Sequence, residues 1–456
     1  MAAEKVTTLF AGQALTPAGW VTNARVTIRQ GEIAAVEPGA EPSPDDERYA
    51  NLLPAMPNLH SHAFQRAMAG LTEISGTQTD SFWTWRETMY RFALAMTPEQ
   101  VEAVAAQLYV EMLEAGFCRV GEFHYLHHDR DGRPYARISE MAERIASAAE
   151  HTGIGLTLLP VFYAHSAFGA AEPAAGQRRF VNHPNRFANL LEGCREALKP
   201  LNQSVLGVAP HSLRAVTPAQ LTEVTEFCPA GPIHIHVAEQ VKEVEDCLAW
   251  SGARPVEWLL ANAQVDPRWC LVHATHMTVA ESAALARSGA VAGLCPVTEA
   301  NLGDGIFPAP HFLRAGGEFG IGSDSNVLIG VGEELRQLEY SQRLANRARN
   351  VLAGAGGSTG RSLFDRARRG GAQALGAGLP EIAAGAPADL VTLRAEHPTL
   401  WGKRGDALLD AWIFAGAGSV DCAWVHGRKL VEGGRHRQRD AIEARFRRAM
   451  TELIAA

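Results

Sequence analysis

The chain has 456 residues, 46% of them hydrophobic and 20% charged, which is ordinary for a globular protein and leaves room for a large core with an accessory domain. Its formal net charge is −8, so it offers no general attraction to nucleic acid or to an anionic membrane, and neither is expected as a partner.

The seven cysteines are scattered and form no CxxC pair, which argues against a disulfide framework and for a reducing compartment. The first residues lack a basic segment followed by a long apolar core, so no signal peptide is expected. No run approaches the roughly 20 apolar residues that a membrane helix needs. We therefore expect a soluble, cytoplasmic protein.

Both ends of the chain have the pattern of short antiparallel strands. Runs in which apolar and polar side chains alternate are separated by turn residues. We expect residues 1–54 and 386–436 to form one small composite β-sandwich domain. The runs are 7–15, 20–30, 32–38, 388–395 and 422–434.

Between these ends, compact apolar runs alternate with long stretches of helical period. In the segment 97–116, Thr97 suits a helix N-cap and Pro98 suits the first helical position. Such alternation implies a parallel sheet, and eight strands are the number in a closed (β/α)₈ barrel, whose chemistry lies at the C-terminal strand ends. We expect an α/β fold with a TIM-like barrel over 55–385 and a C-terminal helix over 437–456. The candidate strands are 52–60, 118–125, 154–163, 205–211, 232–239, 269–275, 290–296 and 319–324.

Four of the expected strands end in side chains that bind metals. His60 and His62 end the first strand, and residues two apart on a strand face the same side. His236 ends the fifth strand and His273 the sixth, and Asp324 follows the eighth. These positions would converge at one end of a barrel.

Two neighbours complete this pattern. Glu239 lies just past the fifth strand, as expected of a proton carrier beside a metal, whereas His234 lies deeper in that strand and is interpreted as a packed core histidine. Taken singly, each residue has an ordinary structural explanation, such as a helix N-cap for Asp324. Their combination at successive strand ends predicts a metal site.

The pattern resembles the amidohydrolase superfamily over nearly the whole chain, including the segment 385–391, which commonly re-enters the β-domain. Binuclear members add a bridging lysine or glutamate. Lys199 lies between helix and loop and is not expected to bridge, whereas Glu122 on the second strand stays open as a bridge. Iron or manganese would also suit the donor set. The resemblance implies one Zn²⁺ per subunit, bound by His60, His62, His236 and Asp324.

Such a centre implies hydrolytic release of ammonia. The cation lowers the pKa of a bound water toward about 7. Asp324 can accept the proton of that water, Glu239 can deliver protons to the substrate nitrogens, and His273 can orient or stabilise the attacking group.

Four longer segments point to one family within this superfamily. They look like those of formimidoylglutamate deiminases, which convert N-formimidoyl-L-glutamate and water to N-formyl-L-glutamate and ammonia in bacterial histidine degradation. This resemblance also suggests a homodimer. The segments are 58–66, 82–86, 121–127 and 295–305.

A small anionic substrate with two carboxylates needs fixed cations, and arginine suits carboxylates better than lysine does. Arg86, in an aromatic loop after the first strand, and Arg214, just after the fourth, are the candidates, and Arg66 is a weaker one. Trp83 and Trp85 either pack the loop or form a wall for the substrate. Further hydrogen bonds to the substrate are expected from Gln65, Tyr125 and His211.

Three other functions share parts of this pattern. A deaminase for an amino-heterocycle such as guanine would use the same metal ligands, with aromatic stacking and amide contacts in place of the arginines. Imidazolonepropionase, a hydrolase of similar fold, would open a ring without releasing ammonia. A catalytically inactive barrel that acts as an assembly protein would be expected to lack ligands, and none is missing here. The sequence does not determine whether the loop at 72–92 closes over the substrate.

Overall fold

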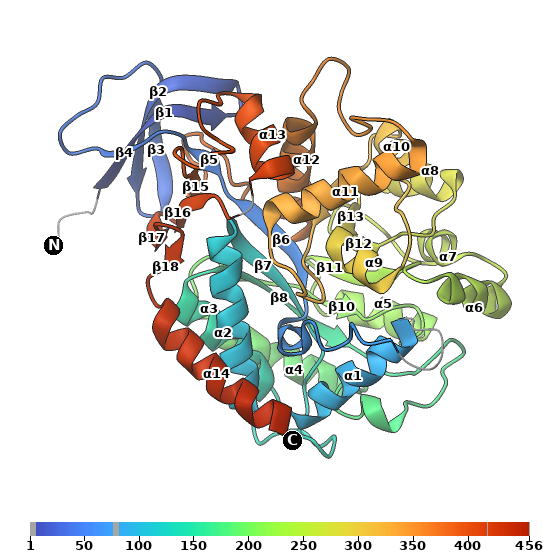
Figure 1. The fold of residues 1–456 in the computed structure, drawn as a ribbon. Coiled ribbons are helices and arrows are strands. Elements are labelled where there is room, and N and C mark those ends of the chain that lie inside the picture. The colour runs from blue at the N-terminus through green and yellow to red at the C-terminus, as the bar shows by residue number, and fades with distance from the viewer. Residues whose placement is uncertain (1–5, 76–81, 417, 456) are drawn as a thin grey trace.

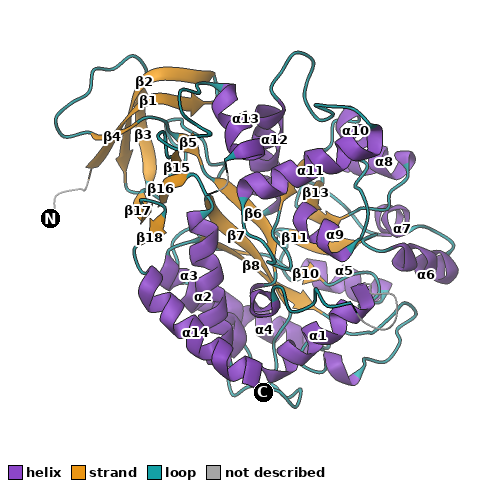
Figure 2. Ribbon diagram, viewed as in Figure 1, coloured by secondary structure: helices purple, strands orange, loops and turns teal. Residues whose placement is uncertain are grey.

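Parallel strands and helices alternate through the central part of the chain in the computed structural model, which describes residues 6–75, 82–416 and 418–455 (Figures 1 and 2). The strands are β6 (Met56–Ser61), β7 (Phe117–His124), β8 (Gly155–Phe162), β9 (Val205–Leu206), β10 (Ala209–Pro210), β11 (Ile233–Val237), β12 (Trp269–His273), β13 (Val291–Leu294) and β14 (Glu318–Ile321). They form two parallel sheets, β6 to β10 and β11 to β14. Backbone bridges join Ser61 to Asp324 and Val208 to Ile233, so the sheets close into one barrel.

The eight strand positions expected from the sequence are all present, the fourth as the pair β9 and β10. Gly207 lies in the break between them. A Cβ at this position would lie 2.5 Å from the carbonyl oxygen of Pro232, so glycine permits the close approach of neighbouring backbones. The structure thus confirms the expected barrel.

Helices surround the barrel strands (Figure 2). They are α2 (Pro98–Glu114), α3 (Glu140–Thr152), α4 (Pro184–Leu198), α5 (Pro218–Glu226), α6 (Val241–Ser251), α7 (Pro255–Asn262), α8 (Val279–Ser288), α9 (Pro296–Leu302), α10 (Ala309–Arg314), α11 (Val331–Asn346) and α12 (Thr359–Ala374). The predicted start of α2 is confirmed, because the Thr97 hydroxyl accepts a hydrogen bond from the backbone N–H of Gln100 at 3.2 Å. Within the described ranges, no helix is long and apolar enough to cross a lipid bilayer.

Strands from both ends of the chain form two small sheets beside the barrel (Figure 1). They are β1 (Val6–Thr16), β2 (Gly19–Arg29), β3 (Glu32–Glu37), β4 (Glu47–Tyr49), β5 (Leu53–Pro54), β15 (Leu390–Leu393), β16 (Val420–Val425), β17 (Arg428–Glu432) and β18 (Arg435–His436). One sheet has the order β3-β2-β1-β4 and the other β18-β17-β16-β15-β5. Both contribute to one buried core that contains Leu9, Val26, Leu390 and Trp424. The two ends of the chain therefore build a composite domain.

Two further helices lie near the C-terminus. α14 (Arg439–Ala455) packs on α2, where Gln100 donates a hydrogen bond to Glu452 at 2.8 Å. α13 (Asp406–Ala415) lies between β15 and β16 and packs on α11 and α12. The sequence did not predict α13, because strand patterns flank it on both sides.

The sequence predicted an aromatic loop at 72–92. This prediction is wrong for the second half of the segment, which forms α1 (Phe82–Ala95). The buried side chains Met89, Phe92 and Ala93 follow helical spacing and pack in the main core. The cluster of aromatic residues at its start concealed this period. Residues 76–81 lie outside the described residues.

Candidate metal centre and active site

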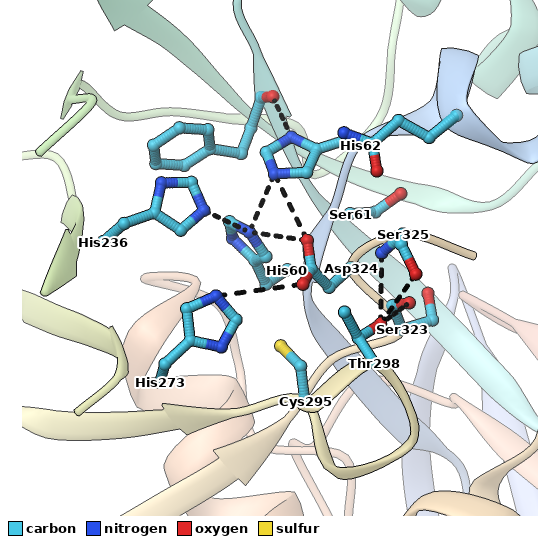
Figure 3. Close-up of polar contacts among 12 residues, drawn as sticks. His60, Ser61, His62, His236, His273, Cys295, Thr298, Ser323, Asp324 and Ser325 are labelled. Carbon is cyan, nitrogen blue, oxygen red and sulfur yellow. Dashed lines mark hydrogen bonds and ion pairs between the residues drawn. The ribbon is translucent and has the colours of Figure 1, made fainter. Parts of the chain in front are cut away.

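Four buried side chains converge at the C-terminal end of the barrel (Figure 3). His60 and His62 come from β6, His236 from β11, and Asp324 follows β14. The Nε2 atom of His60 lies 3.2 Å from that of His62 and 3.1 Å from that of His236. The Oδ1 atom of Asp324 lies 3.5 Å from Nε2 of His60 and 3.3 Å from Nε2 of His62.

Backbone carbonyl groups orient two of these imidazoles. His62 Nδ1 donates to the carbonyl of Phe123 at 2.9 Å, and His236 Nδ1 donates to the carbonyl of His211 at 3.1 Å. Each Nε2 atom then turns a lone pair toward the others, which is the arrangement of metal-ligating histidines. Burial also lowers the pKa of His60 to about 3, so its ring stays neutral. The donor set therefore fits a divalent cation such as Zn²⁺.

The local backbone brings β14 close to β6. At Gly322, a Cβ would lie 2.8 Å from the carbonyl oxygen of His60, so a larger residue would separate the strands at the cluster. Asp324 and His273 adopt left-handed φ angles of 45° and 66°, which residues other than glycine adopt rarely. Such conformations concentrate at functional sites, where the surrounding fold holds them in place.

Three carboxylates surround His273. Its Nε2 atom lies 3.8 Å from both Oε1 of Glu239 and Oδ2 of Asp324, and its Nδ1 atom lies 3.3 Å from Oε1 of Glu299. Burial alone would lower the pKa of His273, but the carboxylates, led by Glu239, raise it to about 10. The ring is therefore a proton donor at neutral pH in the absence of a cation.

Glu239 occupies the turn between β11 and α6. The buried carboxylate of Glu243 accepts hydrogen bonds from the N–H groups of Ala238 and Glu239, both at 3.2 Å, and so fixes this turn. Burial raises the pKa of Glu239 to about 7, and repulsion from Asp324 adds to this effect. A carboxyl group with this pKa can exchange a proton near neutral pH.

A single pocket joins the metal-binding cluster to the five side chains that the sequence suggested for substrate binding. Gln65 donates a hydrogen bond to the Tyr125 hydroxyl at 2.8 Å, and Oε1 of Gln65 is buried without a partner in the described chain. The described lining residues are His62, Gln65, Trp85, Arg86, Met89, Tyr90, Tyr125, Tyr163, Phe180, His211, Arg214, His236, Glu239, His273, Leu302 and Asp324.

The two arginines reach this pocket from different elements. Arg214 is 8% exposed, and its guanidinium makes no hydrogen bond or ion pair with any other residue that the structure describes. Arg86 lies on α1, with its guanidinium 5.5 Å from the ring centre of Tyr90. The sequence therefore predicted the pocket position of Arg86 but not its element, because Arg86 lies on a helix and was expected in a loop.

The residues considered as bridging ligands lie outside the metal-binding cluster. The Glu122 carboxylate accepts hydrogen bonds from the Ala63 N–H at 2.7 Å and the Tyr109 hydroxyl at 3.2 Å. Burial raises its pKa to about 8. Lys199 is exposed at the end of α4 and pairs with Glu196. Neither residue is among the donors that converge with His60.

Other sequence candidates have structural contacts. Arg66 pairs with Glu111 at 2.8 Å and donates to the carbonyl of Asn326, and it does not line the pocket. His234 lies in the barrel interior and contacts the carbonyl of Ala374 at 2.7 Å. Trp85 lines the pocket, and the side chain of Trp83 lies outside the described part.

Several pocket residues were not identified from the sequence. Tyr163 directly follows β8, so the rule that places sites at strand ends would have found it. Its hydroxyl accepts a hydrogen bond from Gln177 at 2.7 Å. Tyr90 lies on α1, and Phe180 lies in the connection between β8 and α4, where no sequence pattern marks it.

Comparison with known proteins identifies the class. The model of the amidohydrolase family matches residues 51–430. An adenosine deaminase structure from Xanthomonas campestris with bound zinc shares the fold with a TM-score of 0.82 at 21% identity, covering 99% of each chain. The chain belongs to the amidohydrolase family.

A second family model and one close relative place the chain within a branch of that family, the formimidoylglutamate deiminases. The model for the N-terminal domain of formimidoylglutamate deiminase HutF matches residues 6–50. The formimidoylglutamate deiminase of Pseudomonas aeruginosa is 52% identical over 98% of this chain and 99% of its own length. An amidohydrolase structure from Brucella melitensis has a TM-score of 0.96 at 62% identity, covering 98% of this chain and 100% of its own. These findings confirm the family and the fold class expected from the sequence.

Proposed function

We propose that the protein is a zinc-dependent hydrolase that converts N-formimidoyl-L-glutamate and water to N-formyl-L-glutamate and ammonia. One observation carries this proposal. One pocket is lined by His62, His236 and Asp324 of the metal-binding cluster and by Arg214, whose buried guanidinium makes no hydrogen bond or ion pair among the described residues. The name and the 52% identity of the Pseudomonas aeruginosa relative support the same substrate.

His60, His62, His236 and Asp324 would hold one zinc ion per subunit. When bound, this ion supplies a Lewis acid that lowers the pKa of water toward about 7. The inward-facing Nε2 atoms and the zinc named for the Xanthomonas campestris structure support the choice of metal. The donor types also suit iron or manganese, so metal analysis of the purified protein is part of the test.

Two carboxylates handle the protons of the reaction. Oδ2 of Asp324 faces away from His60 and His62 and can accept the proton of the attacking water. Glu239 can deliver a proton to the substrate nitrogen that leaves as ammonia, because its pKa of about 7 lets it carry a proton at neutral pH. The new bond joins the water oxygen to the formimidoyl carbon, and the bond that breaks joins that carbon to the terminal imino nitrogen, while the glutamate nitrogen stays attached.

His273 acts beside these carboxylates as a donor. Its Nε2 atom faces the space between Glu239 and Asp324, and Glu299 holds its opposite side. A protonated imidazole there can stabilise negative charge that develops on the attacking oxygen. Its removal would therefore lower kcat more than substrate affinity.

The part of the pocket that contains the two arginines suits the two substrate carboxylates. Arg214 and Arg86 would each pair with one of them. Gln65, Tyr125 and His211 would add hydrogen bonds. Met89 and Phe180 supply apolar surface that excludes water and strengthens these charged contacts.

The pocket also contains an observation that favours a second function. Tyr90, Tyr125, Tyr163 and Phe180 offer aromatic surface of the kind that a deaminase for an amino-heterocycle would use. The buried guanidinium of Arg214 favours the acyclic dianion instead, because a neutral ring would leave this charge without a counterion from the substrate.

Ammonia release distinguishes the two substrates. The protein, loaded with one equivalent of Zn²⁺, is assayed with N-formimidoyl-L-glutamate, guanine and adenosine. Ammonia from the first compound alone supports the proposal. Ammonia only from guanine or adenosine would replace it with ring deamination at the same metal centre.

Assembly and location are part of the same proposal. We expect a cytoplasmic homodimer, and the seven buried free thiols support a reducing compartment. Light scattering of the purified protein tests the dimer, because one chain has a mass of 49.1 kDa.

A further inference from the structure

A second group of metal-binding atoms lies directly behind the proposed zinc site. Cys295 follows β13 and is fully buried. Figure 3 shows its sulfur pointing toward the space between His273 and Asp324. Single ligand atoms of these three residues all lie within 4.8 Å of one another. The deiminase chemistry proposed above makes no use of this thiol.

The separation between His273 and Asp324 in this group is close to that between two ligands of a bound ion. Ligand atoms of a tetrahedral zinc site lie about 3.3–3.7 Å apart. Nε2 of His273 lies 3.8 Å from Oδ2 of Asp324 and 3.8 Å from Oε1 of Glu239. Nδ1 of His273 faces Glu299 at 3.3 Å, and a carboxylate in this position orients a metal-ligating histidine.

The surroundings also favour a cation. Asp304 and Glu334 are buried, and one carboxylate oxygen of each has no hydrogen-bond partner among the described residues. Both interact electrostatically with Asp324. A cation bound beside Asp324 would interact favourably with these two unpartnered oxygen atoms.

We propose that Cys295, His273 and Asp324 form a second, inhibitory site for a thiophilic divalent cation such as Cd²⁺ or excess Zn²⁺. Because Oδ1 of Asp324 faces His60 and His62 while Oδ2 faces His273, this carboxylate can bind both ions. The second ion occupies the atoms that handle protons, so it inhibits. This inference rests on the proposed function, because inhibition requires the reaction assigned to the site.

The sulfur ligand determines which ions bind. Thiolates select soft or borderline ions such as Cd²⁺ and Zn²⁺, whereas Mg²⁺ prefers oxygen. Mg²⁺ at the same concentration should therefore leave turnover unchanged. Inhibition should begin only after the first equivalent of Zn²⁺ has been bound, because the first site has three imidazole ligands.

The test uses the full-length protein with Cys295→Ala and, as a matched control, Cys270→Ala. Cys270 is a buried thiol in the same inner-barrel cluster. Cys295→Ser is a second variant in case the alanine variant fails to fold. Each metal-free protein is titrated with Cd²⁺ while thiolate-to-cadmium absorption is followed, and the ions retained through gel filtration are counted.

The wild type and Cys270→Ala should retain two ions per chain with thiolate absorption, and the Cys295 variants should retain one without it. A single retained ion in the wild type, or two in the Cys295 variants, overturns the proposal. Cadmium binding needs no substrate, so this result stands whether or not the protein hydrolyses N-formimidoyl-L-glutamate.

In the active enzyme, the Zn²⁺ concentration for half-inhibition, relative to each variant's own activity, should rise at least about tenfold in Cys295→Ala. Inhibition at the wild-type concentration would contradict the proposal.

Discussion

The imidazole of His273 is held from behind by the carboxylate of Glu299, with 3.3 Å between Nδ1 and Oε1. The same oxygen accepts a hydrogen bond from the N–H of Cys295 at 2.9 Å, so the carboxylate is itself fixed in place. Glu299 thus acts through His273 as a positioning residue, although it lies on α9, outside the strand ends that carry the metal-binding cluster.

Removing this support should lower turnover. We expect Glu299→Ala to reduce kcat roughly 10- to 100-fold, with little change in KM, because the ring of His273 loses its orientation. Glu299→Gln should be less impaired, since its amide oxygen can still accept the hydrogen bond. Steady-state kinetics of the two variants, each checked for zinc content, would contradict this role if the alanine and glutamine variants were equally active.

Replacing Glu239 should separate metal binding from catalysis. Glu239→Gln keeps the shape of the side chain and lies outside the four metal ligands, so we expect a normal zinc content. Loss of the proton carrier should lower kcat roughly 10²- to 10⁴-fold. Elemental analysis and turnover measured on one preparation would exclude the assignment if the variant were nearly as active as the wild type.

The pKa of Glu239 predicts a pH-dependent stability of the metal-free protein. Burial raises this pKa from 4.5 to about 7, so folding favours the protonated form. Its stabilising contribution is complete below pH 4.5 and is lost as pH rises through about 7. The loss amounts to roughly 3 kcal/mol.

Metal-free Glu239→Gln should therefore be more stable than the metal-free wild type at about pH 8, by up to roughly 3 kcal/mol. The difference should shrink toward zero as the pH falls below 4.5, where the folded and unfolded wild type both keep the proton. Denaturant unfolding at both pH values measures it. The same difference at both pH values would show that ionisation of Glu239 is not the cause.

His236→Ala should abolish both zinc binding and turnover. It removes one of three imidazole ligands and leaves His60 and His62 with Asp324 as an incomplete set. Chelation of the wild type should give the same loss of activity, reversed by one equivalent of Zn²⁺. Zinc retention by the variant at wild-type affinity would be inconsistent with the proposed ligand set.

Loss of either pocket arginine should weaken substrate binding. A charged hydrogen bond contributes about 1.5–3 kcal/mol, so Arg214→Gln and Arg86→Gln should each raise KM roughly 10- to 150-fold. Arg91→Gln is a matched control, since Arg91 lies on α1 with Arg86 but is exposed and does not line the pocket. Unchanged KM in the Arg214 variant would argue against a carboxylate contact at that residue.

The barrel could be predicted from the sequence because its strands are short apolar runs between turn residues, and their C-terminal ends must lie together in a closed parallel barrel. His60 and His62 share one face of β6 for the same reason. The structure brings them together with His236 and Asp324, as that rule implies.

Other pocket residues could not be predicted from the sequence, because long-range packing brings them to the site. Phe180 and Tyr90 reach the pocket from a connection and from α1, and no local pattern encodes that path. Arg86 was placed in a loop because its aromatic neighbours hid the helical period of α1. Cys295 carried no signal of its own, since a lone buried cysteine is ordinary core.

The central claim is that one pocket couples a metal-dependent hydrolysis to the recognition of two carboxylates. The most direct test is the ratio of kcat/KM for N-formimidoyl-L-glutamate to that for formamidine, an analogue that keeps the amidine group and lacks both carboxylates, with the zinc-loaded wild type. Two charged contacts predict a ratio of roughly 10² to 10⁴, with N-formyl-L-glutamate as the product. Equal values for the two compounds would contradict the claim.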